Sequence, residues 1–326
     1  MSVPYSPPKS PAPRSTRVLS RAERAQGGIW GLLLGDAVGV PYEFHRPEGL
    51  PPLDELDLTP PPGFHRAHSG TPVGTWSDDG AHALALLDSL LTHRGLNLRD
   101  LGDRLVAWYE RGQYAVGGRV FDVGIQTTAA LRALSSGADP EAAGPAAERS
   151  NGNGSLMRVL PLALWHRGDD VALVHDAHRQ SLVTHGHRRS QICCAWYCLW
   201  ARAELAGEPE APQRALARLR AIYAARWPEH GAELEATLTP DSPPPPRGTG
   251  YVVDCLYSAM WACEGEDARA VIRRAISLGH DTDTTACVAG GIAGVRWGLE
   301  GLPSDWLGRL RGRELVEPLI DRLLAL

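Results

Sequence analysis

Long apolar runs are missing from this chain of 326 residues, and so is any cluster of positive charge. No stretch approaches the roughly 20 apolar residues that a membrane-spanning helix needs. Prolines stand at the N-terminus where a signal peptide has its apolar segment, so we expect a cytoplasmic protein that does not enter a membrane. The net charge is −5, and the basic residues, nearly all arginine, are spread along the sequence. That distribution argues against a dedicated nucleic-acid-binding module.

Cysteine is scarce too, with six residues in the whole chain. A disulfide framework in a protein of this length would need more of them. Cys193, Cys194 and Cys198 lie in one apolar segment, and Cys194 and Cys198 share a helical face. A metal or redox site is one interpretation of that face. The apolar neighbours favour the other interpretation, that these are small buried side chains in a reducing compartment.

The residues that are present have the composition of a folded globular protein, with 43% hydrophobic and 22% charged residues. Residues 1–20 form a proline-punctuated tail for which we expect disorder, and the remaining length admits one large domain or two small ones. Apolar side chains recur at helical spacing from Arg21 onward, and no stretch alternates as a strand does. The pattern predicts an all-α fold interrupted by two proline-rich loops, 46–74 and 240–246.

A first short acidic segment stands at the start of an apolar helical stretch. It reads GTWSDDG and contains Ser77, Asp78 and Asp79. Serine and aspartate cap helix N-termini, and carboxylates there suit the helix dipole, so capping explains this segment when it is taken alone.

A second acidic segment, LGHDTDTT, opens a helix far along the chain with Asp281, Asp283 and Thr284. Residues two apart on a helix point away from each other, so the two aspartates can share an ion only if Asp281 lies in the turn before the helix. One face of the helix is unusually small and predicts that another backbone packs closely against it. That face consists of Ala286, Ala289, Gly290, Gly291, Ala293 and Gly294.

Four carboxylates brought together without a counter-charge would repel one another, and their burial would raise their pKa values. Divalent cations resolve this conflict, and oxygen ligands from Asp, Ser and Thr select the hard ions Mg²⁺ or Mn²⁺ over zinc. From two such segments we infer two ions, which form a clamp that orients a substrate and activates a water. The inference requires that the two segments meet in the fold.

A glycine-rich turn lies between the acidic segments, in RSNGNGSLMRVLPLAL. Its residues Ser150, Gly152, Asn153, Gly154 and Ser155 come before an apolar helix, where free backbone N–H groups can bind phosphate. An ordinary Asn-Gly loop is the competing interpretation.

A further turn, SLVTHGHRRS, offers His185 and His187. A lone histidine in a turn is more often structural or solvated than catalytic.

Taken together and in this order, the segments resemble one family, the ADP-ribosylglycohydrolases, from Ile29 to the C-terminus. The family includes the dinitrogenase-reductase-activating glycohydrolases and the mammalian ADP-ribosylhydrolases. The resemblance rests on GLLLGDAVGVPYEF, GTWSDDG, FDVGIQTTAAL, NGSLMRVLPLAL, SLVTH, GTGYVVDCLYSAMWA and LGHDTDTTACVAGGIAGVRWGLEGLPSDW. It implies one domain over residues 21–326, an all-α orthogonal bundle of many helices, and hydrolysis of the glycosidic bond between ADP-ribose and an acceptor.

The resemblance also implies roles for particular residues. A pair of Mg²⁺ or Mn²⁺ ions would be held by Ser77, Asp78, Asp79, Asp281, Asp283 and Thr284. The diphosphate would lie against the turn formed by Ser150, Gly152, Asn153, Gly154 and Ser155, together with Met157. His185 would contact ribose or phosphate, and Tyr251 would lie near adenine. Asp79, Asp283 and Glu43 would be catalytic, with Glu43 on a mobile segment as a gate or an acid acting on the leaving group.

Two residues depart from the family pattern. Gly80 replaces a hydroxyl residue of the first segment, and His280 stands where many relatives have glycine. Both changes leave the expected metal ligands in place. Because of them, the family resemblance does not define the leaving group.

Three functions remain open from the sequence. The first is an ADP-ribosyl hydrolase acting on a protein, nucleic-acid or small-molecule conjugate, through attack of water on the anomeric carbon and an oxocarbenium-like transition state. The second is a hydrolase or phosphatase of a small ADP-ribose derivative or of ADP-ribosylated nucleic acid. The third is a non-catalytic protein similar to the lens crystallins of jellyfish that resemble this family. The loop 46–74 is expected to contact the leaving group.

Overall fold

The structure is a computed structural model, and it describes residues 18–326. Helices make up nearly all of its regular structure, and the pairing of extended backbone in this part is limited to one isolated bridge between Gly152 and Tyr251. The all-α prediction is confirmed. Of the tail expected at residues 1–20, residues 1–17 lie outside the described residues. Ser20 caps the first helix, because its hydroxyl accepts from the N–H of Glu23 and its own N–H donates to the Glu23 carboxylate.

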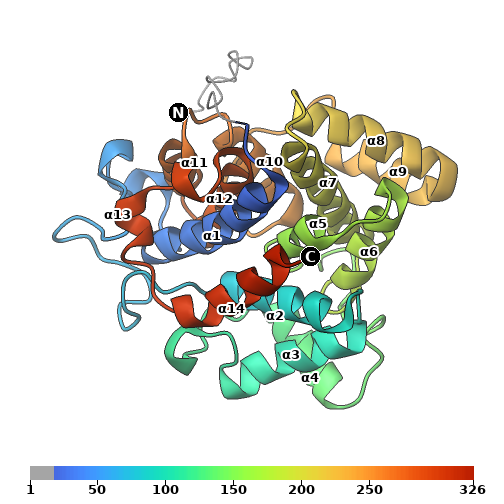
Figure 1. The fold of residues 1–326 in the computed structure, drawn as a ribbon, viewed down its shortest axis with the longest axis horizontal. Helices are drawn as coiled ribbons and strands as arrows, with labels where there is room; N and C mark the ends of the chain where they lie inside the picture. Colours follow the sequence, from blue (N-terminus) through green and yellow to red (C-terminus); the bar gives the residue numbers. More distant parts are fainter. Residues whose placement is uncertain (1–17) are drawn as a thin grey trace.

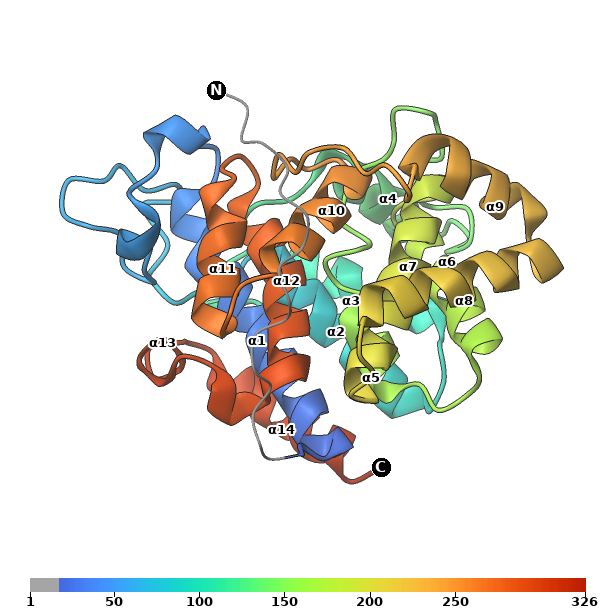
Figure 2. The same ribbon diagram turned by 90° about the horizontal axis from the view of Figure 1, so that it is seen from above.

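Two helices from opposite ends of the chain form the centre of the molecule (Figures 1 and 2). They are α1 (Arg21–Gly39) and α12 (Thr282–Trp297). A Cβ atom on Gly31 would lie 2.3 Å from the carbonyl oxygen of Gly290, and one on Gly35 would lie 2.0 Å from that of Ala286. The close approach predicted from the small face of residues 286–294 is therefore confirmed, and glycines of α1 provide the matching face.

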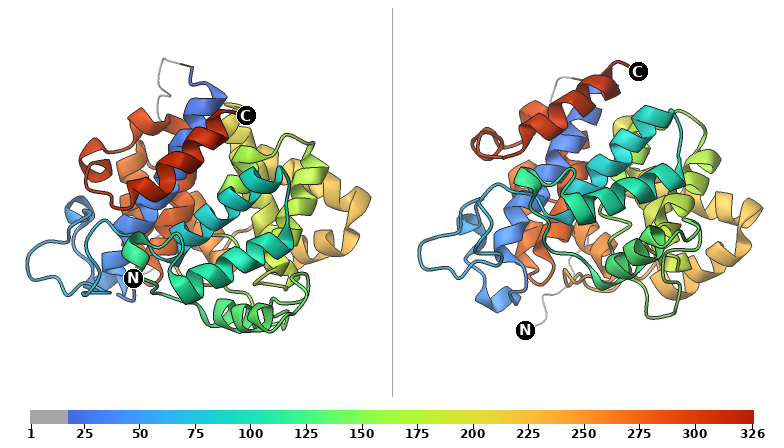
Figure 3. Two further views of the ribbon diagram at one scale, coloured as in Figure 1. Left: turned by 60° about the horizontal axis from the view of Figure 1, so that its bottom comes forward. Right: turned by 90° about the horizontal axis from the view of Figure 1, so that it is seen from below.

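The remaining helices surround this pair. The chain runs through α2 (Asp78–His93), α3 (Leu98–Arg111) and α4 (Ile125–Ser135), then through α5 (Leu160–Trp165), α6 (Asp170–Leu182), α7 (Arg188–Leu205), α8 (Ala211–Arg226) and α9 (Pro228–Glu233). It closes with α10 (Val252–Ala262), α11 (Ala268–Ser277), α12, α13 (Ser304–Leu307) and α14 (Arg313–Leu324). Figure 3 shows α14 lying beside α1 and α2. The loop 46–74 and the pair α8 and α9 occupy opposite edges of the molecule (Figure 2).

The core contains the cysteines as well as large aromatic side chains such as Trp76, Trp108 and Trp200. All six cysteines are buried and free, and the groups of side chains within residues 18–326 that could hold a metal include none of them. The structure therefore supports small buried side chains over a cysteine site. Within the same residues, no helix combines the length and the hydrophobicity that a membrane span requires.

Two local features differ from the sequence-based expectation. Helix α6 was not predicted, because His175, Asp176, His178 and Arg179 interrupt its apolar spacing. The glycine-rich turn does not lead directly into a helix, since α5 begins only at Leu160, with a proline in its first turn. The loop 46–74 contains two short 3-10 helices, Pro47–Gly49 and Leu53–Glu55, and is otherwise irregular, as expected.

Candidate metal centre and substrate cavity

The first acidic segment forms the N-terminus of α2. Ser77 is the N-cap, in an extended conformation, and its hydroxyl accepts a hydrogen bond of 3.3 Å from the N–H of Asp79. Asp78 and Asp79 lie in the first turn and are buried. Ser77 therefore caps the helix, but capping does not explain why both carboxylates are buried.

The second acidic segment forms the N-terminus of α12. Asp281 precedes the helix and Asp283 lies in its first turn, as the spacing argument required. The turn before them is left-handed at Gly279 and His280. It is fixed to a distant segment by two backbone hydrogen bonds, from the N–H of Phe44 to the oxygen of His280 at 2.7 Å and from the N–H of His280 to the oxygen of His45 at 2.6 Å.

The two acidic segments meet in the fold. The hydroxyl of Thr284 donates to Oδ1 of Asp79 at 3.2 Å. One ligand atom from each of Asp36, Asp79 and Asp283 lies within 4.8 Å of the others, and the same holds for Glu43, Asp281 and Asp283. Oδ2 of Asp79 and Oδ2 of Asp283 are buried and have no hydrogen-bond partner among the described residues. Buried carboxylate oxygens without a donor fit a cation as their partner.

Asp36 is a functional candidate that the sequence interpretation missed. It is fully buried near the end of α1, and its carboxylate accepts from the N–H of Ser77 at 2.9 Å and of Gly80 at 2.8 Å. These bonds join α1 to the first acidic segment. The signal in the sequence was a single acidic residue in an otherwise apolar helix, GLLLGDAVG.

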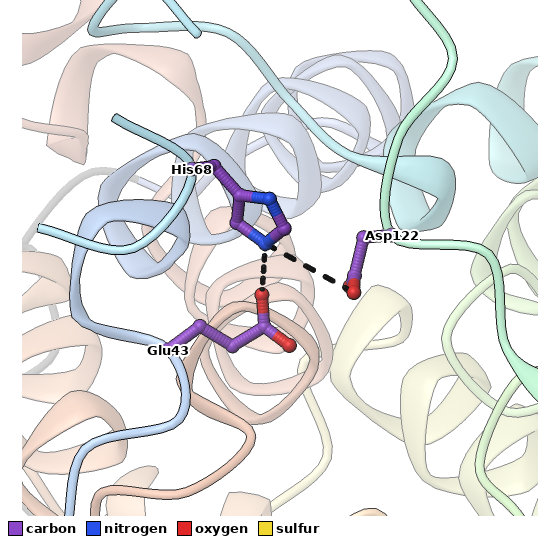
Figure 4. Close-up of side chains that lie close together, drawn as sticks. All are labelled: Glu43, His68 and Asp122. Atoms are coloured by element: carbon purple, nitrogen blue, oxygen red, sulfur yellow. Dashed lines mark hydrogen bonds and ion pairs between the residues drawn. The ribbon is translucent and has the colours of Figure 1, made fainter. Parts of the chain in front are cut away.

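Glu43, His68 and Asp122 form a second group around the same carboxylates (Figure 4). Nε2 of His68 lies 2.7 Å from Oε2 of Glu43 and 4.0 Å from Oδ1 of Asp122. The sequence interpretation did not single out His68 or Asp122. Asp122 belongs to the motif FDVGIQTTAAL, and its place in that motif could have identified it. His68 lies in the irregular loop, where no sequence pattern marks it.

Burial dominates the electrostatics of these carboxyl groups. It raises the pKa of Glu43 to about 11, with further contributions from Asp122, Asp281 and Asp78. It raises the pKa of Asp36 to about 7 and that of Asp122 to about 6. The pKa values of Asp78, Asp79 and Asp283 also lie well above the ordinary range, again through burial and neighbouring carboxylates. Without cations the cluster retains protons, so a divalent cation competes with protons for these oxygens.

A cavity of about 710 Å³ extends from the acidic group to the glycine-rich turn. Its walls include Glu43, Asp78, Asp122, Asp281 and Thr284 at one end, and Gly152, Asn153, Gly154, Met157, His185 and Tyr251 at the other. Ser150 and Ser155 are not among its lining residues. Ser155 is fully buried, and its hydroxyl instead accepts from that of Ser181 at 2.9 Å.

Two backbone N–H groups of the glycine-rich turn already donate hydrogen bonds within the protein. The N–H of Gly152 donates to Oε1 of Gln126 at 2.8 Å, and the N–H of Asn153 donates to the oxygen of Gly250 at 3.1 Å. The side chain of Asn153 donates to Oδ2 of Asp281 at 2.9 Å, which ties the turn to the acidic group.

The two histidines of SLVTHGHRRS have different surroundings. His185 is buried and lines the cavity, and burial, with the charge of Arg158, lowers its pKa to about 3. His187 is the N-cap of α7, where its ring accepts from the N–H of Arg189 at 3.2 Å. His187 therefore has the structural role that a turn histidine usually has.

Comparison with known proteins agrees with this geometry. The family model described as ADP-ribosylglycohydrolase matches residues 17–326. The chain belongs to the ADP-ribosylglycohydrolase family. This glycohydrolase is accordingly a glycosidic-bond hydrolase.

Three relatives of this glycohydrolase cover most of its length. An ADP-ribosylarginine hydrolase of Pseudomonas putida is 29% identical over 97% of this chain and 84% of its own. The ADP-ribosyl-dinitrogen reductase glycohydrolase of Rhodospirillum rubrum is 26% identical over 93% of this chain and 96% of its own. An ADP-ribosylhydrolase of Homo sapiens is 26% identical over 92% of each chain.

A solved structure also matches, described as an ADP-ribosylglycohydrolase-related protein complex. It superposes with a TM-score of 0.73 at 32% identity, and the match covers 94% of this glycohydrolase and 98% of that chain.

The structure gives physical reasons for both departures of this glycohydrolase from the family pattern. A Cβ atom on Gly80 would lie 2.7 Å from the Leu33 side chain and 2.8 Å from that of Trp76, so a larger residue there requires these side chains to move. His280 has a φ of 61°, a left-handed conformation that glycine adopts without strain. Its backbone bonds to Phe44 and His45 hold that conformation.

Proposed function

We propose that this glycohydrolase removes ADP-ribose from arginine side chains, with two Mg²⁺ or Mn²⁺ ions in the acidic group. The observation that carries the proposal is the meeting of the two acidic segments at one end of a cavity whose other end is the glycine-rich turn. The acidic end suits cations and the ribose hydroxyls. We assign the diphosphate to the other end, where the side chain of His185 lines the cavity beside the glycine-rich turn.

We assign the ions to Ser77, Asp78, Asp79, Asp281, Asp283 and Thr284. This set contains only oxygen donors, which suits hard cations. When bound, two such ions supply Lewis-acid chemistry that orients the ribose hydroxyls and makes a water more acidic. Asp36 is not in the set, because its carboxylate already accepts from two backbone N–H groups and holds the first acidic segment in place.

The residues of the chain perform the proton transfers in this proposal. Asp79 and Asp283 use Oδ2 as the cation ligand in this proposal, and Oδ1 of each, which accepts one hydrogen bond from Thr284, has a second lone pair for a proton from the attacking water. Glu43 lies at the cavity wall with Nε2 of His68 2.7 Å from its carboxyl group, so it is placed to pass a proton to the leaving group. Backbone hydrogen bonds of Phe44 and His45 with His280 join the segment of Glu43 to the turn before α12, so the backbone of Glu43 is held in place. The transition state would have oxocarbenium character.

Charge and aromatic surface favour a cationic acceptor. The acidic end contains seven carboxyl groups, and with Glu43 protonated the other six still exceed the four positive charges of two divalent ions; the seven are Asp36, Glu43, Asp78, Asp79, Asp122, Asp281 and Asp283. The His68 ring lies 5.5 Å from that of Phe44 and 5.0 Å from that of Phe121, measured between centroids, and Phe44 is 70% exposed. Carboxylates beside aromatic faces suit a guanidinium group. Two relatives at 29% identity are named ADP-ribosylarginine hydrolases.

A substrate panel tests the acceptor. Peptides ADP-ribosylated on arginine or on serine, ADP-ribosylated nucleic acid and a small ADP-ribose derivative would be incubated with the protein and Mg²⁺ or Mn²⁺. We expect the arginine conjugate to have a kcat/KM about 100-fold above the others, the factor that an unpaired buried charge produces. Equal or faster turnover of serine or nucleic-acid conjugates would contradict the arginine assignment. Turnover that survives complete removal of divalent cations would contradict the metal assignment.

A further inference from the structure

Arg158 is a buried cation without a carboxylate partner. It lies just after the glycine-rich turn and is fully buried, and none of the ion pairs within residues 18–326 includes it. Its guanidinium donates to four neutral acceptors: Oε1 of Gln180 at 3.0 Å, the oxygen of Gln180 at 2.7 Å, the oxygen of Gly154 at 3.3 Å and Oγ1 of Thr184 at 2.6 Å.

Neutral acceptors satisfy the hydrogen bonds of Arg158 but leave its charge unbalanced. Burial lowers its pKa to about 10, so the group stays positively charged at neutral pH. A buried charge without a counter-charge is unfavourable, and it is retained only where something in the functional state balances it. Gly154, whose oxygen accepts from Arg158, lines the cavity together with Gly152 and His185.

The bonds of Arg158 also determine which nitrogen of His185 carries the proton. Arginine can only donate, so the Thr184 hydroxyl accepts from it. The hydroxyl proton of Thr184 is then available for its other contact, Nδ1 of His185 at 2.8 Å. Among the hydrogen bonds that the described residues form with this hydroxyl, Nδ1 is the one atom able to accept its proton. Nδ1 is therefore an acceptor, and in a neutral imidazole Nε2 must carry the proton.

Nε2 of His185 points toward the glycine-rich turn at the cavity. A Cβ atom on Gly152 would lie 3.4 Å from Nε2, and one on Gly154 would lie 3.3 Å from it. No described residue forms a hydrogen bond with Nε2. The N–H groups of Gly152 and Asn153 already donate hydrogen bonds within the protein, so neither is free for a ligand. The N–H at Nε2 of His185 provides a donor at the same turn.

We propose that Arg158 is a positioning residue for the diphosphate of the bound ligand. It places a positive charge beneath the glycine-rich turn and, through Thr184, fixes His185 as an Nε2–H donor to a phosphate oxygen. The inference rests on the proposed function only in taking ADP-ribose as the ligand, and it holds for any acceptor to which the ADP-ribose is attached.

Binding of ADP-ribose and of adenosine to the metal-free protein, measured by calorimetry, tests this role. Arg158→Gln should weaken ADP-ribose binding about 30-fold or more, because a buried charge facing the diphosphate is lost. Adenosine has no diphosphate, and its affinity should change less than about threefold. Arg296→Gln is the matched control, since Arg296 is a largely buried arginine paired with Glu204 near the far end of α12, and it should leave both affinities unchanged. Equal losses for both ligands in Arg158→Gln would overturn the proposal.

The tautomer of His185 gives a second measurement, because a general loss of stability would not select which ring nitrogen carries the proton. Nitrogen-15 NMR of labelled imidazoles should show His185 neutral with the proton on Nε2. Thr184→Val removes the hydroxyl and should mix the two tautomers and weaken ADP-ribose binding about fivefold, the value of one neutral hydrogen bond. Thr184→Ser keeps the hydroxyl and should restore both properties. If Arg158→Gln does not fold, the comparison of Thr184→Val with Thr184→Ser still tests the proposal.

An Nδ1–H tautomer in the wild type, or a Thr184→Val protein that binds ADP-ribose like the wild type, would overturn the inference. These measurements involve no turnover. Failure of the arginine conjugate in the substrate panel would therefore contradict the proposed function and leave this inference standing.

Discussion

The two ends of the cavity have opposite unbalanced charges. The acidic end gathers carboxylates from α1, α2, α12 and the loops around them, and their mutual repulsion and burial raise their pKa values. The other end has one buried arginine, Arg158, whose partners are all neutral. We propose that cations balance the charge of the acidic end and that the diphosphate balances the charge of Arg158, so each ligand supplies the charge that its end lacks.

The same comparison predicts opposite effects on stability. Removal of one carboxylate from the acidic end relieves repulsion in the metal-free protein. Removal of Arg158 instead leaves buried acceptors without a donor, which destabilises the fold.

Asp283→Asn should have the largest effect. It removes a buried carboxylate from the centre of the acidic group, and we expect kcat/KM to fall by about 1,000-fold or more, equivalent to about 4 kcal/mol of lost transition-state stabilisation. In EDTA the same variant should unfold at higher urea concentration than the wild type, with a gain of roughly 1–3 kcal/mol from reduced charge repulsion. Asp103→Asn, at an exposed position of α3, is the control and should change neither quantity. A destabilised but active Asp283→Asn protein would contradict this account.

The metal-free protein should lose stability as the pH rises from about 4 to about 7. The pKa of Asp36 rises from 3.8 to about 7 on folding, and that of Asp122 rises from 3.8 to about 6. In this window the folded state binds more protons than the unfolded state, so the free energy of unfolding falls with rising pH, by several kcal/mol in total. Urea unfolding across this pH range measures the effect, and saturating Mn²⁺ should reverse the slope above pH 6. A metal-free stability that is flat or rising through this window would exclude the buried carboxylates as its cause.

Gly35→Ala should separate the two ends of the cavity. The added Cβ atom would lie 2.0 Å from the carbonyl oxygen of Ala286, so α1 and α12 must move apart beneath the acidic end. We expect a loss of stability of about 3 kcal/mol and a weaker affinity for Mn²⁺, while the metal-free protein keeps its affinity for ADP-ribose. The control is Gly49→Ala, an exposed position with nothing within 4 Å of the added atom. Equal behaviour of the two variants would show that the close packing of α1 and α12 does not position the metal centre.

Tyr251→Ala should have the smallest effect of the three variants and should change substrate binding but not the chemical step. Tyr251 lines the cavity beside the glycine-rich turn, where its backbone pairs with Gly152, and it is 38% exposed. Loss of its ring should raise KM about fivefold and leave kcat within about twofold. Tyr251→Phe keeps the ring and should resemble the wild type in steady-state kinetics. A fall in kcat for the alanine variant would place Tyr251 closer to the reacting bond than this arrangement allows.

The sequence predicted the parts of the molecule that repeat a local pattern. The helices follow from apolar spacing, and the close packing of α12 follows from its run of alanines and glycines. The two acidic segments were predicted to meet because they contain unusual local concentrations of carboxylates. In each case the residues that carry the signal are neighbours in the chain.

Single residues from separate segments were not predictable in this way. Asp36 is one acidic residue in an apolar helix, and His68 is one histidine in a long irregular loop, so neither has neighbours that mark it. The burial of Ser155 and the occupied N–H groups of Gly152 and Asn153 depend on Ser181, Gln126 and Gly250, which lie elsewhere in the chain. Such contacts appear only when the fold brings the segments together.

The most direct test of the central claim is a titration of the metal-free protein with Mn²⁺, followed by electron paramagnetic resonance. If the two acidic segments share a pair of cations, two Mn²⁺ ions should bind per chain and give the spin-coupled signal of ions about 3.5–4 Å apart. Asp283→Ala should abolish that coupling. Saturation at one uncoupled ion per chain, or an unchanged coupled signal in Asp283→Ala, would contradict the account.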